Sequence, residues 1–330
     1  MKKKPCTLQN IADEVGCVTN TVSLALRDST RISKKMRVRI KQVAERMGYV
    51  PNLAARNLKM RQSGLIGIYA AGAEDDVRVT LINSLIRQLH STHYKPILGI
   101  ADFPGDPWFK APWIDSFRAL RVDALVIVAW EMQKTIATIA QQVPTIVVGC
   151  PPVTRQEFVD CVALDRYAAG RMGTEHLLER GRTHICICAP PPPDDFTRGC
   201  LDTLCQAGAI HCGPDITNYS SLSKTDSFCA DLLASRPKPT AVIFGDSSKA
   251  AIFLSVALKQ GVRIPQDLAV IGYDYFTWAD HLKVALTTIE QPLLEMASFS
   301  AELINKRLSE PHEPKIHRVL SHHLAVREST

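Results

Sequence analysis

Along the first fifty residues, apolar side chains recur with the period of an α-helix. Residues 8–15 form one such stripe, which Thr7 can cap at its start and Gly16 can end. A second stripe begins at Thr19 and a third follows Ser33. Two short helices separated by a glycine turn predict a helix-turn-helix, and the third helix would close its small core.

The second of these helices has an apolar and a polar side. Val22, Ala25 and Leu26 share the apolar side, which we expect to be buried. The outward side then presents Thr19, Asn20, Ser23, Leu24 and Arg27. In a helix-turn-helix these outward positions face the major groove of DNA, so the pattern favours a DNA-binding head.

A short segment after the third helix has the composition of a marginal helix. Pro51 restarts the chain, and residues 53–59 suffice for about two helical turns, too few to be stable alone in water. We therefore expect this segment to fold on contact with a partner. Ala55 would allow two copies to approach closely, Arg56 suits a narrow minor groove, and Leu58 suits insertion between base steps.

From Ser63 onward, short apolar strands alternate with amphipathic helices. This alternation predicts parallel sheets with crossover helices, in two successive α/β units separated by a loop at Pro151-Pro152. The strands expected in the first unit are 65–69, 96–100, 124–129 and 145–148. Those expected in the second unit are 162–164, 185–187, a weaker 216–217, 241–244 and 268–271.

Charge is distributed unevenly along the 330 residues. Up to Gln62 there are 14 Lys and Arg against 4 Asp and Glu, a net charge of +10, whereas the whole chain carries +6. The rest of the chain therefore carries +6 − 10 = −4. A basic head on a mildly acidic body is typical of a nucleic-acid-binding module joined to a domain that does not bind nucleic acid.

The cysteines and the N-terminus bear on compartment and metal chemistry. The ten cysteines include no Cys-x-x-Cys pair, and Lys2 to Lys4 precede polar residues instead of an apolar leader, so we expect a cytoplasmic location. Cys186 and Cys188 fit small buried side chains on one strand face better than a metal or redox pair. No apolar run approaches the ~20 residues of a membrane helix. We expect no membrane segment, no metal and no cofactor.

The order of these motifs resembles the LacI/GalR (lactose/galactose repressor) family of transcriptional regulators. The head carries T-L-x-x-I-A-x-x-x-G-x-x-x-x-T-V-S from Thr7, then Arg31-Ile32-Ser33, then Gly48-Tyr49-x-Pro51-Asn52-x-x-Ala55-Arg56-x-Leu58. The body carries Arg180-Gly181-Arg182, Gly272-Tyr273-Asp274, Leu286-Thr287-Thr288-Ile289-x-Gln291 and a terminal Leu324-Ala325-Val326-Arg327. The resemblance extends over nearly the whole chain.

The resemblance implies an all-α helix-turn-helix head followed by an α/β body of two doubly wound parallel-sheet subdomains of the periplasmic-binding-protein type. We expect the DNA-binding domain at 1–50, a hinge helix and linker at 51–62, and an effector-binding and dimerisation domain at 63–330. Its N-subdomain would span about 63–160 and 291–319, and its C-subdomain about 161–290 and 320–330. No leucine-rich tail follows Thr330, so we expect a homodimer.

The same resemblance implies which residues contact DNA. In the family the second helix reads the major groove, and the paired hinge helices of a dimer enter the minor groove. The implied DNA-binding residues are Thr7, Thr19, Asn20, Thr21, Ser23, Leu24, Arg27, Arg31, Asn52, Ala55, Arg56 and Leu58. Leu24 is a departure, because many members have Arg there. Leu24 can contact a thymine methyl group but cannot pair with guanine, whereas Asn20 can pair with adenine.

Ligands of open α/β sheets bind beyond the carboxyl ends of the strands, and a cleft between two such sheets collects those ends. The candidate effector-binding residues at these ends are Trp108, Trp130, Glu131, Cys150, Asp165, Phe196, Asp246, Tyr273, Asp274 and Gln291. Carboxylates with aromatic rings suit a polyhydroxylated ligand. Asp246 and Asp274 are also compatible with a second role, as caps of the helices that follow them, and for Asp246 the sequence favours this role at least as much as ligand binding.

Departures from the family leave the nature of the effector open. Phe196 stands where an arginine often grips the ligand, and Gly245 stands where asparagine is usual. A common sugar and a more apolar, phosphate-poor effector are both compatible with this set. The chain lacks the Gly-x-Gly-x-x-Gly, phosphate-loop, His-Glu-x-x-His and Gly-x-Ser-x-Gly motifs, so we expect no enzymatic activity.

We therefore expect a sequence-specific repressor whose affinity for a pseudo-palindromic operator is changed by a small molecule, such as a sugar, bound between two subdomains. Two alternatives stay open from the sequence. One is a regulator controlled by a protein partner, with a degenerate ligand cleft, and the other is a DNA-anchored enzyme.

Overall fold

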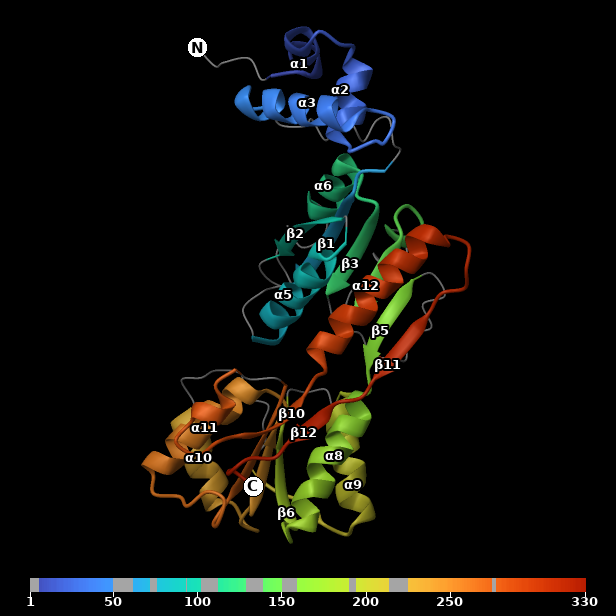
Figure 1. Cartoon of the computed structure of the whole chain (residues 1–330). Helices are drawn as coiled ribbons and strands as arrows, with labels where there is room; N and C mark the ends of the chain where they lie inside the picture. Colours follow the sequence, from blue (N-terminus) through green and yellow to red (C-terminus); the bar gives the residue numbers. More distant parts are fainter. Residues whose placement is uncertain are drawn as a thin grey trace. The chain divides into compact units, whose positions relative to one another are not determined.

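The computed structural model divides the chain into two compact units, Met1–Ser63 and Gly64–Thr330 (Figure 1). The residues that it describes are 6–49, 62–71, 76–92, 94–101, 112–128, 139–149, 159–189, 194–213, 225–274 and 277–330.

The first unit is a bundle of three helices, α1 (Leu8–Val15), α2 (Thr19–Leu26) and α3 (Lys34–Arg46). Thr7 caps α1 reciprocally with Asn10: the Thr7 hydroxyl accepts from the Asn10 N–H at 3.3 Å, and Asn10 Oδ1 accepts from the Thr7 N–H at 3.0 Å. Gly16 ends the helix with a φ of 79°, a left-handed conformation that glycine adopts without strain. The predicted three-helix head is confirmed.

The second unit begins with a parallel sheet whose strand order is β11-β5-β4-β3-β1-β2. Its strands are β1 (Leu65–Ala71), β2 (Lys95–Ala101), β3 (Ala124–Val128), β4 (Thr145–Val148), β5 (Asp160–Leu164) and β11 (His317–Leu320). Its helices are α5 (Asp76–His90), α6 (Pro112–Leu120) and α12 (Leu293–Ser309). The strand order β2-β1-β3-β4-β5, which reverses direction at β1, is that of a doubly wound sheet.

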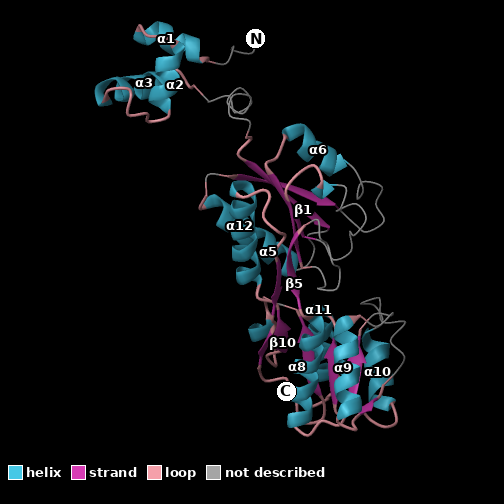
Figure 2. Ribbon diagram, turned by 90° about the vertical axis from the view of Figure 1, so that its right-hand side faces the viewer, coloured by secondary structure: helices cyan, strands magenta, loops and turns pink. Residues whose placement is uncertain are grey.

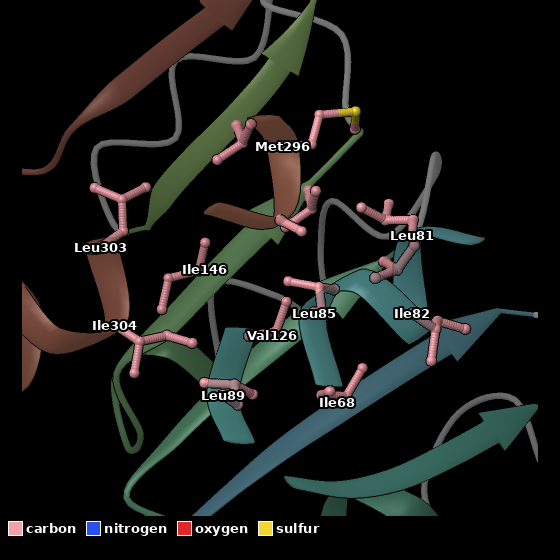
Figure 3. Packing of buried hydrophobic residues seen from close by; sticks show 14 of the residues in the cluster. Ile68, Leu81, Ile82, Leu85, Leu89, Val126, Ile146, Met296, Leu303 and Ile304 are labelled. Atoms are coloured by element: carbon pink, nitrogen blue, oxygen red, sulfur yellow. The ribbon is translucent and has the colours of Figure 1, made fainter. Parts of the chain in front are cut away.

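One face of this sheet is covered by α5 and α12. Ile68, Val126 and Ile146 point from three neighbouring strands toward Leu85 of α5 and Ile304 of α12 (Figure 3). All five side chains are buried in one apolar cluster. Since α5 ends at His90 and α12 begins only at Leu293, this core joins segments from distant parts of the chain.

A second sheet has the order β12-β10-β9-β8-β6-β7, and it is parallel except for β12, which runs antiparallel to β10. Its strands are β6 (His184–Cys188), β7 (Ile210–His211), β8 (Ala241–Phe244), β9 (Ala269–Tyr273), β10 (Thr287–Glu290) and β12 (His323–Ala325). Its helices are α8 (Arg166–Glu179), α9 (Asp195–Gln206), α10 (Thr225–Ala234) and α11 (Ser247–Lys259), followed by a 3-10 turn, η4 (Ala279–His281). Figure 2 shows these helices beside the strands.

One strand belongs to a different sheet from the one expected. Residues 162–164, assigned from sequence to the second unit, lie in β5, which pairs with β4 through Val147 and Cys161 and so extends the first sheet. The apolar pattern of a strand is the same in either sheet, so only its pairing partner decides its place. The expected strand at 216–217 lies outside the described residues.

The chain therefore passes between the two sheets after β5, after β10 and after β11. The last passage is short, because only Ser321 and His322 separate β11 from β12. Segments near these passages are where a ligand between the sheets would lie.

Neither a membrane helix nor a metal cluster is found in the described part of the chain: no helix there is long and apolar enough to cross a membrane, and no three His, Cys, Asp or Glu side chains gather to hold an ion. Cys186 and Cys188 share one strand face, as expected, with their sulfur atoms 3.7 Å apart in the apolar core. Burial raises the pKa of the Cys188 thiol, which keeps it protonated.

Candidate functional site

The outward side of α2 is the candidate DNA-binding face. Val22 and Ala25 are completely buried, which fixes the rotation of the helix on the bundle. Asn20 and Arg27 are exposed, and Thr19, Thr21, Ser23 and Leu24 are half-buried. Thr7, at the start of α1, and Arg31, in the loop after α2, are also exposed.

Arg27 and Ser23 form a unit on this face. Arg27 Nε donates to the Ser23 carbonyl at 3.0 Å, and Arg27 Nη2 donates to Ser23 Oγ at 2.7 Å. Because Ser23 Oγ accepts from the guanidinium, its own proton is left to donate outward, to a phosphate oxygen or a base acceptor. Sequence reasoning named both residues but missed the pair, which their i,i+4 spacing on a helix makes possible.

The loop after α2 is organised by Asp28, which has a left-handed φ of 59°. Lys41 Nζ bonds its carboxylate at 2.6 Å, and Arg37 Nη1 donates to its carbonyl at 2.9 Å. The hydrogen bond from Lys41 lowers the pKa of Asp28. Asp28 thus fixes the turn that carries Arg31 and neutralises part of the surrounding basic surface.

Several predicted site residues lie outside the described residues. Of the DNA-binding set these are Asn52, Ala55, Arg56 and Leu58; of the effector-binding set they are Trp108, Trp130, Glu131 and Cys150.

The predicted aspartates lie at the carboxyl edge of the strands, and two of them cap helices. Asp165 Oδ1 accepts from the Ala168 N–H at 2.8 Å and starts α8. Asp246 Oδ1 accepts from the Lys249 N–H at 3.1 Å and starts α11. The structure therefore shows the capping role for Asp246 that the sequence left open.

Asp274 does not cap a helix in this way. Its own backbone is instead held by hydrogen bonds to Ile289 and from Ser247. Its φ is 86°, its N–H donates to the Ile289 carbonyl at 2.9 Å, and its carbonyl accepts from Ser247 Oγ at 2.7 Å. Gln291 Nε2 donates to its carboxylate. The structure therefore brings together two residues, Asp274 and Gln291, that the sequence had named separately.

Phe196 and Tyr273 do not offer ring faces to a ligand in this structure. Both are completely buried, with ring centroids 4.5 Å apart, in the core between α9 and the second sheet. We had expected both rings on the cleft surface, and that expectation is corrected here. Phe196 lies in the first turn of α9 and Tyr273 at the end of β9, so both point into the helix–sheet interface.

Behind these rings lies a polar network that sequence reasoning missed. Arg166 Nη2 bonds Asp194 Oδ2 at 2.6 Å, and Nη1 donates to the Tyr273 hydroxyl at 3.0 Å. The guanidinium also lies over the Tyr273 ring, 4.7 Å from its centroid. Asp194 caps α9 by accepting from the Thr197 N–H at 2.9 Å.

His322 completes this network on the short passage between β11 and β12. The Tyr273 hydroxyl lies 2.9 Å from His322 Nε2. Burial, with Arg166, lowers the pKa of His322 to about 4, so its ring is neutral at pH 7. Arg166 can only donate to the hydroxyl, so the hydroxyl donates its own hydrogen bond to Nε2, and the single proton of the neutral His322 ring lies on Nδ1.

Comparison with known proteins gives separate matches for the two units. Residues 7–52 match the sequence model of the bacterial regulatory proteins of the lacI family. Residues 174–330 match the model of a periplasmic binding protein-like domain.

Relatives of similar length align with nearly the whole chain. The ribose operon repressor of Escherichia coli (strain K12) is 25% identical over 313 residues, covering 92% of this chain and 94% of the relative. The HTH-type transcriptional repressor PurR of Klebsiella pneumoniae (strain 342) is 26% identical over 314 residues, covering 91% of each.

Solved structures share the fold at lower identity. A crystal structure of the lac repressor dimer bound to operator and the anti-inducer ONPF superimposes with a TM-score of 0.85 at 20% identity, covering 99% of each chain. A complex of the transcriptional regulator CelR with cellobiose has a TM-score of 0.69 at 23% identity, covering 98% of this chain and 100% of that one.

Proposed function

Because the chain belongs to the lacI family of bacterial regulatory proteins, we propose that it is a repressor that binds operator DNA through its head and a small-molecule effector through its body. The observation that carries this proposal is a three-helix head, in which α2 exposes Asn20 and Arg27, on the same chain as a binding-protein-like pair of sheets. The family consists of regulators, and the expectation that the chain is not an enzyme is confirmed by this membership.

The DNA-binding side of the proposal assigns direct readout to α2. Asn20 is exposed at the start of the helix, where its amide can pair with adenine, and half-buried Leu24 can contact a thymine methyl group. Ser23 and Arg27 form a donor pair suited to a phosphate.

We further propose a cytoplasmic homodimer on a pseudo-palindrome, because one small head makes few base contacts. The segment 51–62 would act as the hinge, with Leu58 inserted between base steps. Leu58→Ala should then weaken operator binding far more than binding to random DNA, as measured by competition titration. Equal loss on both DNAs would contradict this hinge role.

On the effector side, the descriptions of two similar proteins point to one chemical class, the sugars. The ribose operon repressor and the CelR–cellobiose complex are named for sugars, and PurR is named as a repressor without a ligand in its description. In this chain the proposed contacts are the carboxylate of Asp274 and the amide of Gln291, with Asp165 after β5 and Asp246 after β8 as further candidates.

Selection of bound sequences from a random DNA pool by the full-length protein tests the DNA-binding proposal. The expected result is a pseudo-palindrome with half-site centres about 10 bp apart. Binding without sequence preference would overturn it.

The effector proposal is tested on the selected operator. Thermal shift against sugars and nucleosides identifies ligands, and each hit is then added to the protein–operator complex. A hit that changes operator affinity supports the proposal. A body that binds no small molecule but captures a protein that changes operator affinity would favour control by a protein partner.

A further inference from the structure

The Arg166–Asp194 ion pair is a built feature of the edge where the proposed effector-binding residues lie. Its two members start neighbouring helices, since Arg166 is the first residue of α8 and Asp194 is the N-cap of α9. Those helices touch backbone to backbone: a Cβ added at Gly170 would lie 2.1 Å from the Phe196 carbonyl oxygen, and one at Gly199 equally close to that of Tyr167. The ion pair is therefore held by two helices that cannot move closer or slide without a clash.

Each charge of the pair is also fixed on its own side. Asp194 Oδ1 accepts from the Thr197 N–H at 2.9 Å and from Thr197 Oγ1 at 2.8 Å, while Asp194 Oδ2 accepts from Arg166 Nη2. Although burial acts in the opposite direction, the hydrogen bonds from Thr197 and Arg166 lower the pKa of Asp194, so it is ionised at pH 7. Arg166 in turn is held over Tyr273, and the side chain of Arg166 is only 21% exposed.

A ligand that carried a phosphate or carboxylate would have to displace Asp194 from Arg166. That would leave a half-buried carboxylate without its cation, which is unfavourable. The negative charge of Asp274 also acts on Arg166, so an incoming anion would meet a second carboxylate near the same guanidinium. The pair therefore presents a guanidinium whose charge is already neutralised by Asp194, so it offers a ligand no net positive charge.

A separate observation, at Gln291, indicates what the ligand must provide. Gln291 is 2% exposed, and its Nε2 donates to the Asp274 carboxylate, so the other amide atom, Oε1, faces away from that carboxylate. Among the described residues no donor reaches this buried Oε1. A buried acceptor requires a hydrogen-bond donor. A hydroxyl or amine group of a ligand can supply one, whereas an ionised phosphate or carboxylate cannot.

We propose that the Arg166–Asp194 pair is a specificity determinant that makes this edge accept uncharged ligands bearing hydroxyl or amine donors and reject their phosphorylated or carboxylated forms. The inference rests on the proposed effector role of the body and adds to it the charge class of the effector. The ion pair discriminates by weakening the binding of anionic ligands. It does not need to add a contact to the uncharged ligand.

The first test uses inorganic phosphate as the probe, so it does not depend on the identity of the effector. Asp194→Asn retains a good N-cap for α9 but releases Arg166 from its carboxylate. Phosphate affinity, measured by thermal unfolding at constant ionic strength, should rise roughly tenfold or more in this variant, the value of one hydrogen bond to a charged group. The double variant Asp194→Asn/Arg166→Gln should lose that gain, which separates it from phosphate bound by the basic head.

Asp195→Asn is the matched control. This variant also removes one negative charge, but from the neighbouring residue Asp195, whose carboxylate bonds Arg198 and not Arg166. It should leave phosphate affinity at the wild-type value. A wild-type protein that already binds phosphate through Arg166, or an Asp194→Asn variant without a gain, would overturn the proposal.

The second test compares matched ligands by calorimetric titration of the full chain, with ribose against ribose 5-phosphate and glucose against glucose 6-phosphate. The uncharged member of a binding pair should bind wild type more tightly, and Asp194→Asn should narrow the difference. A phosphorylated member that binds wild type better and changes operator affinity would refute the charge selection while leaving the effector role intact. If no ligand of any panel bound, the effector role itself would fail, and the phosphate test would still decide whether the pair excludes anions.

Discussion

Asp274 combines an unusual backbone conformation with a half-buried position next to the buried Gln291. Its φ of 86° is uncommon for a residue with a side chain, and aspartate and asparagine tolerate it better than most. The hydrogen bonds from Ser247 and to Ile289 hold the backbone there, which directs the carboxylate to Gln291. The left-handed backbone conformation at Asp274 therefore sets the direction of its carboxylate.

Two substitutions separate the role of this carboxylate from that of the backbone. Asp274→Asn keeps a residue that tolerates the left-handed conformation, whereas Asp274→Ala adds strain of about 1 kcal/mol. Both should weaken effector binding by roughly tenfold or more, the value of a hydrogen bond to a charged group. Only Ala should also lower the melting temperature clearly. Effector titration and thermal unfolding measure the two effects; if both variants merely unfold, the carboxylate is structural.

His322 should make stability depend on pH. Its folded-state pKa is about 4, below the usual value near 6.5, so the unfolded chain binds more protons between these values. The stabilising contribution is present above about pH 6.5 and is lost as the pH falls toward 4, by up to about 1.4 kcal/mol per pH unit.

His322→Gln keeps an acceptor for the Tyr273 hydroxyl but does not titrate, so denaturant unfolding of this variant should show a shallower decline between pH 7 and pH 4. His176 and His211, whose pKa values are also lowered by burial, would account for the remaining slope. Parallel pH profiles for wild type and variant would show that His322 does not contribute.

How far the sequence reveals a residue's role depends on the range of its interactions. The cap at Thr7 and the turn at Gly16 were predicted because both act within a few positions. The bond from Arg166 to Asp194 spans 28 positions and that to Tyr273 spans 107, so no local pattern records either. The prediction that Phe196 lies at the cleft surface was wrong because a residue at the start of a helix, close to a strand end, can lie either in the cleft or in the core, and the sequence does not distinguish the two.

At the scale of elements, α12 is fastened to the first sheet by a buried ion pair. Arg307 Nε and Nη2 bond both oxygens of Asp160 at 2.8 and 2.7 Å, and the two side chains are 3% and 1% exposed. The same guanidinium donates to the carbonyls of Glu313 at 2.6 Å and Pro314 at 3.0 Å. One side chain therefore joins the end of α12, the start of β5 and the loop that leads to β11.

Arg307→Ala should cost about 3–5 kcal/mol in the free energy of unfolding, because it leaves the Asp160 carboxylate buried without a cation. Removing the charge as well, in Arg307→Met/Asp160→Asn, should recover part of that loss. Urea unfolding measures both variants. A loss below about 1 kcal/mol in the single variant would mean that water replaces the arginine.

The elements themselves were largely predictable, but their assembly was less so. Helix and strand periods identified α1 to α3 and most of the strands, because each period follows from burial of one face. The assignment of β5 was wrong because residues 162–164 read identically as a strand of either sheet. Its neighbours β4 and β11 decide the matter, and β11 lies more than 150 positions later.

At the scale of the whole molecule, charge separates the chain into a basic head and an acidic body, with net charges of +10 and +6 − 10 = −4. Operator affinity should therefore fall steeply with salt, with a log–log slope of about −0.9 for each phosphate neutralised.

Arg27→Gln should reduce that slope by about one unit per head while leaving the order of preferred sequences unchanged, because we assign Arg27 to a phosphate. Filter binding over a range of salt concentrations checks the slope. A change in sequence preference with an unchanged slope would instead place Arg27 on a base.

The passage of the chain between its two sheets has a consequence for synthesis. The first sheet receives its outer strand from residues 317–320 and the cover of one face from α12 at 293–309. The head is complete after about fifty residues, but a ribosome must make nearly the entire protein before the body can close its core. A prematurely terminated product would carry a finished head on a sheet whose apolar face is covered by α5 but lacks the cover of α12. Such products would be recognised by proteases and chaperones, so the fold itself limits the lifetime of DNA-binding fragments that no effector could control.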